Sequence, residues 1–325
     1  MFLSKKKLLT GLTALLCVCS LRAQTPYWQQ RVDYTIDVSL NDQQHTLDAF
    51  ARIIYYNQSP DTLHYIWFHL WPNAYKNDKT ALSDQLLENG STRFYFATQE
   101  ERGYINRLDF KVNDQHAETA DHPNYIDIIR LMLPTPLPPG QKVTITTPFH
   151  VKLPEVFSRS GHEGQRYQIT QWYPKPAVYD RDGWHPLPYL DQGEFYSNFG
   201  TYDVHITLPS NYVVAATGQL MDESEKNCYN CGQELVQKGP GLNGFLNDGR
   251  KRPGLAPSKQ SQRNFLLRPV HKRHFISGKK MCWTLPGLPT NASGYCRTPA
   301  GSTMVPLFPC RVILYRPKLR AGKKV

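Results

Sequence analysis

The chain has 325 residues, of which 40% are hydrophobic, 20% charged and 12% aromatic. This composition excludes a collagen-like chain, a membrane-embedded chain and a chain that is disordered throughout. Charge divides the sequence into three segments, with net charges of +4 for residues 1–23, −9 for residues 24–227 and +16 for residues 228–325. Cysteine follows the same division, because the middle segment has none. We therefore expect three segments of different kinds.

The first segment has the pattern of a targeting peptide. Three lysines at 5–7 precede an apolar run at 8–21, and the small residue Ala23 follows. This pattern predicts a signal peptide that is cleaved near Ala23, and hence export to the periplasm or the cell exterior. The apolar run is shorter than the ~20 residues that a spanning helix requires, so no stable membrane span is expected.

Residues 24–227 have the pattern of a β domain. Apolar and polar residues alternate from Val32 to Leu40, which predicts a strand with one solvated face. A run of prolines and glycine at 134–140 predicts a stiff connector, and residues 80–89, before Gly90, predict a helix. The whole predicts a mainly β fold, an antiparallel saddle-like or sandwich sheet. Further strands are expected at 47–56, 63–71, 125–133, 143–153, 167–172, 202–208 and 212–220.

Catalytic motifs are scarce in this β domain. His162-Glu163 begins like the zinc-protease motif H-E-x-x-H, but Arg166 stands where the second histidine is needed. Gly161 and Gly164 favour a turn rather than a helix at this position. The sequence also has no nucleophile elbow G-x-S-x-G and no phosphate loop. Neither a metal site nor a catalytic residue is predicted here.

Six short motifs occur in a characteristic order: 33–38 (DYTIDV), 47–49 (LDA), 57–59 (NQS), 67–75 (WFHLWPNAY), 168–174 (QITQWYP) and 202–209 (YDVHITLP). Together they resemble the N-terminal domain of the zinc gluzincin aminopeptidases, the alanyl aminopeptidase N family, and in particular its secreted bacterial branch. The resemblance extends from residue 25 to residue 222. It implies a saddle of β-strands that packs on a catalytic domain and closes one side of the active-site cleft.

The resemblance implies one substrate-binding residue, Gln171. In the family a glutamine at this motif position helps to hold the free α-amino group of the peptide substrate, and an amide oxygen is a suitable acceptor for an ammonium group. The family usually has an acid two residues later, where this chain has Tyr173. From the residues alone, Gln171 can also be a polar loop residue. We expect it at an exposed rim with its amide free, inside an apolar collar of Trp172, Tyr173 and the loop through Trp184.

The resemblance also implies elements that the sequence does not contain. The family needs H-E-x-x-H with a distal glutamate for zinc, and a G-x-M-E-N segment for the substrate amino terminus, and none of these occurs in the 325 residues. We therefore expect an exported aminopeptidase N-terminal domain that is truncated before its catalytic domain and lacks metal ligands and cofactor of its own. The alternative is a non-enzymatic secreted β-sandwich that binds peptides or other ligands through aromatic loops at 172–196.

The last segment, residues 228–325, has 18 basic but only 2 acidic residues, together with 10 prolines, 11 glycines and 5 cysteines. Three interpretations compete: a basic segment for nucleic acid or a membrane surface, a metal module built on Cys228-x-x-Cys231, and translation out of frame. We favour the third, because the composition changes where a long domain should continue. Disorder is then expected for this segment, with no nucleic-acid partner.

Overall fold

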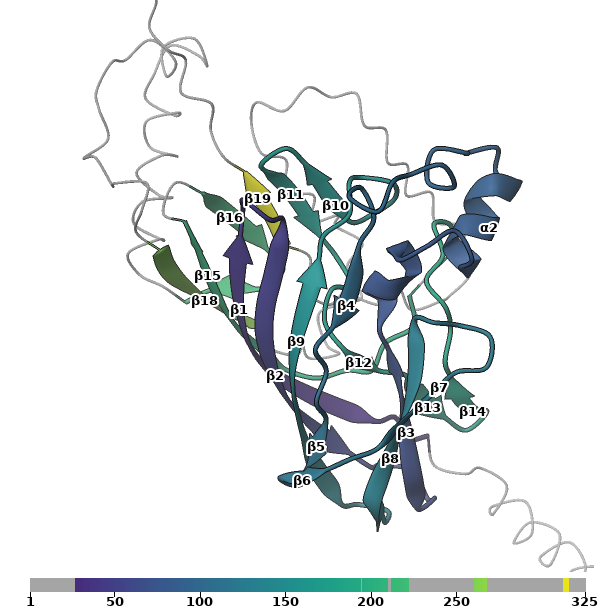
Figure 1. Ribbon diagram of the computed structural model, residues 1–325. Helices are drawn as coiled ribbons and strands as arrows, with labels where there is room; N and C mark the ends of the chain where they lie inside the picture. The colour runs from purple at the N-terminus through teal and green to yellow at the C-terminus, as the bar shows by residue number, and fades with distance from the viewer. Residues whose placement is uncertain (1–26, 194, 210–211, 222–259, 268–311, 316–325) are drawn as a thin grey trace, which may run out of the picture.

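The computed structural model describes residues 27–193, 195–209, 212–221, 260–267 and 312–315 (Figure 1). These residues form a nine-stranded sheet, two four-stranded sheets and a two-stranded hairpin. The mainly β fold with antiparallel sheets agrees with the sequence-based prediction. No helix in the described ranges is long and apolar enough to cross a membrane. The expected signal peptide and Cys228-x-x-Cys231 lie outside the described residues.

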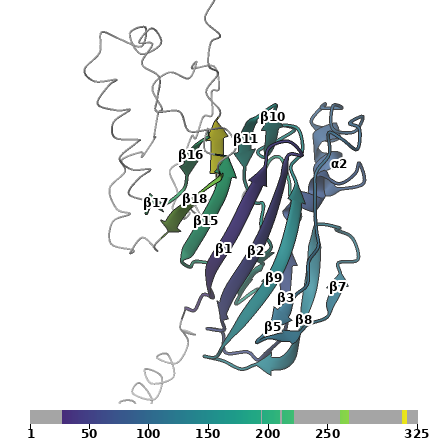
Figure 2. The same ribbon diagram turned by 60° about the vertical axis from the view of Figure 1, so that its left-hand side comes forward.

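The nine-stranded sheet is built on four long strands that lie side by side and curve together (Figure 2). Its order is β17-β18-β15-β1-β2-β9-β5-β6, with β4 on β9. The β1–β15 pair is parallel, which differs from the antiparallel sheet that was expected, while β1–β2 and β2–β9 are antiparallel. The strands are β1 (Arg31–Asn41), β2 (Thr46–Tyr56), β4 (Tyr104–Asn106), β5 (Lys111–Val112), β6 (Gln115–His116), β9 (Lys142–Lys152), β15 (Tyr202–Pro209), β17 (Gln219–Leu220) and β18 (Gln260–Leu267).

The two smaller sheets lie beside this large sheet. One has the order β12-β3-β8-β7, with β3 (Leu63–His69), β7 (Thr119–Asp121), β8 (Ile128–Leu137) and β12 (Lys175–Pro176). The other has the order β10-β11-β19-β16, with β10 (Gly161–Glu163), β11 (Arg166–Ile169), β16 (Val213–Ala216) and β19 (Val312–Tyr315). The hairpin consists of β13 (Val178–Asp180) and β14 (Gly183–His185).

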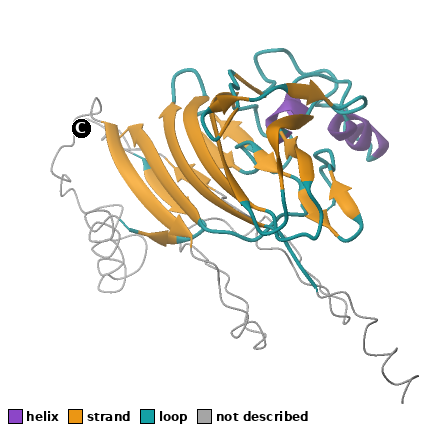
Figure 3. Cartoon of the chain, turned by 90° about the horizontal axis from the view of Figure 1, so that it is seen from below, coloured by secondary structure: helices purple, strands orange, loops and turns teal. Residues whose placement is uncertain are grey.

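The core is built of apolar side chains from the strands of the large and the smaller sheets. Figure 3 shows these strands from below. In β1 every second residue is buried, as the alternation in the sequence predicts. One continuous apolar cluster joins β1, β2 and β9 to β3 and β8, and Phe68 of β3 contacts Phe110 with ring centroids 5.1 Å apart. Burial of this shared apolar surface is the main force that holds the sheets together.

The predicted helix is confirmed as α2 (Ala81–Glu88). The Thr80 side chain caps its N-terminus and accepts a hydrogen bond from the backbone N–H of Ser83 at 3.3 Å.

Two other expectations need correction. Strand β3 ends at His69, and 71–75 form a short 3-10 helix, η1 (Trp71–Tyr75), with Pro72 in its first turn. Strand β8 continues through the expected proline connector to Leu137, because its pairing with β7 stops at Leu131 and the prolines lie beyond it.

Residues 228–325 were expected to be disordered, but two stretches of this segment form the strands β18 and β19. Strand β18 pairs antiparallel with β15 over its whole length, and β19 lies between β11 and β16. Both strands therefore extend sheets formed by the middle segment. The other residues of this last segment lie outside the described ranges.

Candidate functional site

Gln171 lies where the chain leaves β11 and enters β12, and thus passes from one small sheet to the other. Its backbone has φ +53°, in the left-handed region that non-glycine residues rarely adopt. The preceding residue, Thr170, is held by two hydrogen bonds. Its backbone N–H donates to Ser160 Oγ at 3.2 Å, and the Thr170 hydroxyl donates to the Arg159 carbonyl at 3.1 Å. The crossing between the sheets therefore holds Gln171 in a strained conformation, which costs roughly 1–2 kcal/mol.

The expected exposure of Gln171 is wrong. Gln171 is buried, with only 3% of its surface exposed, and Trp172 and Tyr173 are each 2% exposed. Trp172 packs near Phe149 of β9, and Tyr173 packs edge-on against Tyr34 of β1. These rings fill the space over the large sheet, so they form part of the core rather than an apolar collar.

The partner of Gln171 is a buried lysine. Lys175 Nζ donates to Gln171 Oε1 at 3.3 Å and to Ser197 Oγ at 2.7 Å, and it lies 3.8 Å from the centre of the Trp71 ring. The amide, the hydroxyl and the ring face all favour an ammonium group at this position. Burial without a carboxylate partner among the described residues is the larger effect, and it lowers the pKa of Lys175 well below its ordinary 10.5.

His69 extends this polar cluster and also contacts Trp71. The two rings are stacked with centroids 4.3 Å apart, and His69 Nε2 accepts a hydrogen bond from the Leu187 N–H at 3.1 Å. Burial, and next the neighbouring Lys175, lower the pKa of His69 well below 6.5. His69 Nδ1 is buried and has no hydrogen-bond partner among the described residues. Burial therefore favours the uncharged forms of Lys175 and His69 beside the Gln171 amide.

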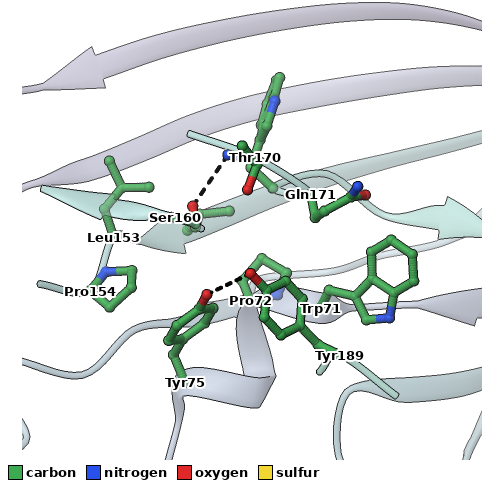
Figure 4. A pocket seen from close by; sticks show the side chains of 11 residues that line it. Trp71, Pro72, Tyr75, Leu153, Pro154, Ser160, Thr170, Gln171 and Tyr189 are labelled. Carbon is green, nitrogen blue, oxygen red and sulfur yellow. Dashed lines mark hydrogen bonds between the residues drawn. The ribbon is translucent and has the colours of Figure 1, made fainter. Parts of the chain in front are cut away.

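A small, mostly apolar pocket lined in part by aromatic rings adjoins Gln171 (Figure 4). Figure 4 shows Gln171 close to Trp71, and beyond it a hydrogen bond of 2.8 Å that joins the hydroxyls of Tyr75 and Tyr189. The backbone N–H of Tyr189 donates to the carboxylate of Asp127 at 2.7 Å. Asp127 is buried, which raises its pKa to about 6.

The arrangement can bind a hydrogen-bond donor. An amide oxygen beside aromatic faces can accept a hydrogen bond from an ammonium group. The described residues contain no group of three or more histidine, cysteine or acidic side chains that could hold a metal ion. His162 lies in β10, and the positive φ of Gly164 confirms the turn predicted there instead of a helix. The zinc that the resemblance implies therefore has no fitting set of ligands in the described residues.

No functional role was predicted from the sequence for Lys175, Ser197, His69 or Asp127. The only available signal for Lys175 was its position in a run of aromatic and apolar residues from 172 to 179, where a charged side chain is unusual. Ser197 and His69 come from segments that only the folded chain brings to Lys175. Their roles depend on long-range contacts and could not be found from local pattern.

Replacing Gln171 by Ala is expected to destabilise the domain by about 2 kcal/mol, because it removes a hydrogen-bond acceptor from the buried Lys175 amine. Chemical denaturation of the purified chain measures this change. Gln168→Ala is the matched control, since Gln168 Nε2 donates only to the Arg159 carbonyl in a half-buried position. Equal stability of the Gln171→Ala protein and the wild type would show that the contact with Lys175 contributes nothing.

Comparisons with known proteins give a partial likeness. No family model matches the sequence, and no curated protein matches it. Among solved structures, the M1 zinc metallopeptidase from Deinococcus radiodurans has 14% identity and a TM-score of 0.38, over 74% of this chain and 39% of that one. A two-domain M1 zinc metallopeptidase mutant bound to L-tryptophan also has 14% identity and a TM-score of 0.38, over 76% and 41%. The chain thus spans about two fifths of these proteins, and similarity at this level does not assign it to a family.

Proposed function

We propose that this chain carries the N-terminal β domain of an exported zinc aminopeptidase, and that Gln171 helps to hold the amino terminus of a peptide. The observation that carries the proposal is the left-handed Gln171 at the crossing between two sheets, next to a small, mostly apolar pocket. A turn with positive φ is made more easily by glycine or asparagine. A strained glutamine that lines a pocket therefore favours a function for the side chain. The ordered motifs of the sequence support the same conclusion.

The chemistry of the cluster suits an ammonium ligand. The amide oxygen of Gln171 has two lone pairs, so it can accept from Lys175 and from one further donor. With the pKa of Lys175 lowered, the amine adds little repulsion against a positively charged amino terminus. The rings of Tyr75 and Tyr189, which line the pocket, can contribute cation–π attraction. In this proposal the domain supplies binding and orientation, and a catalytic domain supplies the zinc and its activated water.

The experiment begins with the coding DNA across codons 215–235, read in all three frames, where we expect a continuation that encodes H-E-x-x-H. The full-length enzyme restored in that frame is then compared with its Gln171→Ala variant on aminoacyl-arylamide substrates. We expect KM to rise about tenfold or more with a smaller change in kcat, since a hydrogen bond to a charged group contributes about 1.5–3 kcal/mol. The 325-residue chain itself is expected to show no hydrolysis and no stoichiometric zinc.

Gln168→Ala is again the matched control, and its KM is expected to stay near that of the wild type. A Gln171→Ala enzyme with unchanged KM would leave Gln171 a purely structural residue. Chelator-sensitive hydrolysis by the 325-residue chain would contradict the proposal that a further domain is needed.

The alternative function, ligand binding by the aromatic loops at 172–196, loses much of its support because Trp172 and Tyr173 are buried. Within those loops, Tyr179 and Trp184 stay half-buried at the surface. They belong to a different surface of the domain.

A further inference from the structure

Seven aromatic rings form a continuous strip on the β12-β3-β8-β7 sheet, the β13–β14 hairpin beside it and the neighbouring segments. Each ring centroid lies between 4.9 and 6.2 Å from the next, and all seven side chains are half-buried. In order, this aromatic strip consists of Trp28, Tyr179, Trp184, Tyr65, Trp67, His122 and Tyr125.

The strip results from the alternation of β3 and from the neighbouring segments. Ile66 and Phe68 point into the core, so Tyr65 and Trp67 lie on the outer face of the sheet. β12 pairs with β3 and leads directly into the hairpin β13–β14, which brings its aromatic residues next to Tyr65. Figure 1 shows this hairpin beside β3, β8 and β7. Segments far apart in the sequence therefore contribute to one surface.

A cation, Arg130, lies within the strip, and none of the described carboxylates pairs with it. Arg130 of β8 is directly opposite Trp67 of β3, and its guanidinium carbon lies 5.3 Å from the Tyr65 ring centre and 5.6 Å from that of Trp67. It makes no hydrogen bond or ion pair with any described residue, and its buried Nε has no partner there. A guanidinium has five donors and normally pairs with carboxylates when partly buried. Arg130 is therefore available for an anionic ligand.

We propose that the aromatic strip binds an acidic polysaccharide in which uncharged sugar rings separate the rings that carry carboxylates. The apolar C–H faces of sugar rings can pack on half-exposed aromatic faces, which bury large apolar areas at low entropic cost. A carboxylate on one sugar can form a two-pronged ion pair with Arg130. The indole N–H groups of Trp67 and Trp184 have no partner among the described residues, so they can donate to sugar hydroxyls.

The charge around the strip argues against nucleic acid. Asp61, Asp121 and Asp180 lie on the segments that bear the strip, and residues 24–227 carry a net charge of −9. A polyphosphate chain needs several cations along its path, and Arg130 is a single one. A sugar polymer with separated carboxylates needs only one such pair among many ring contacts. The strip therefore fits ring stacking with one charged contact.

The test uses the purified chain with a hyaluronan hexasaccharide, in which uncharged rings alternate with carboxylate-bearing rings, as the acidic probe, and with cellohexaose as the neutral one. Tryptophan fluorescence and calorimetry measure binding. Trp67→Ala is expected to weaken binding of the hyaluronan hexasaccharide about tenfold or more, as expected for a central aromatic contact. Arg130→Gln is expected to weaken its binding to a similar degree and to leave cellohexaose unchanged. Trp184→Ala tests the hairpin side without altering β3, and circular dichroism checks the fold of each variant.

Phe96→Ala is the matched control, because Phe96 is a highly exposed aromatic residue outside the strip. Its affinity for the hyaluronan hexasaccharide is expected to equal that of the wild type. Three results would overturn the proposal: no binding of this hexasaccharide by the folded wild type, tighter binding of decaproline or poly-L-glutamate than of the sugar, or binding that Trp67→Ala and Arg130→Gln leave unchanged.

Discussion

Replacing Gly200 by Ala is expected to unfold most of the protein. A Cβ at this position would overlap the backbone carbonyl oxygen of Val32, and neither backbone segment can move without breaking the parallel junction of β1 and β15. That junction includes hydrogen bonds from the Val32 N–H to the Phe199 carbonyl at 2.9 Å and from the Tyr34 N–H to the Thr201 carbonyl at 2.8 Å. We expect a loss of more than about 4 kcal/mol, a large fraction of the usual 5–15 kcal/mol of stability. Thermal denaturation followed by circular dichroism measures it.

The matched control is Gly140→Ala. A Cβ there would meet nothing within 4 Å, but φ is +74°, so the variant has the strain of a left-handed alanine and no clash. We expect it to lose only about 1–2 kcal/mol. A Gly200→Ala protein that is as stable as Gly140→Ala would mean that β15 does not approach β1 as closely as the structure shows.

The strands were predictable from the sequence where one face is buried and the other solvated. Residues 32–40 alternate clearly and residues 47–56 form a run that ends at the turn residues 57–60, and β1 and β2 match these two ranges to within a residue. Shorter strands were missed, because two or three residues such as Lys111–Val112 cannot show a period. The parallel pairing of β1 and β15 was also missed. It joins segments more than 160 residues apart, and local pattern carries no information on such pairing.

The site was predictable only in part. The motif around Gln171 gave its position, but its burial depends on rings from β1 and β9 that pack over the neighbouring residues. Sequence reasoning treated Trp172 and Tyr173 as surface aromatics because a missing partner domain was assumed to cover them. The folded chain buries them by itself. The buried Lys175 shows the same limit, since the atoms that stabilise its amine come from three separate segments.

Replacing Asp127 by Asn is expected to change how stability depends on pH. In the unfolded chain this carboxyl loses its proton near 3.8, whereas burial raises its pKa to about 6 in the folded protein. Between these values the folded state binds more protons than the unfolded state, so stability falls as pH rises. The stabilising contribution is therefore complete below pH 3.8 and is lost once the pH has passed 6. This rise in pKa corresponds to about 3 kcal/mol.

The Asn side chain does not titrate, and its oxygen can still accept the hydrogen bond from the Tyr189 N–H. The stability of Asp127→Asn relative to the wild type should thus be about 3 kcal/mol higher at pH 7.5 than at pH 3.5, as measured by urea denaturation. Any constant cost of packing the new N–H donors cancels in this comparison. For the exposed Asp114→Asn the same difference should stay within about 0.5 kcal/mol. A pH-independent difference for Asp127→Asn would show that Asp127 is solvated in the folded protein, and that the Tyr189 wall of the pocket beside Gln171 is more open than its contacts indicate.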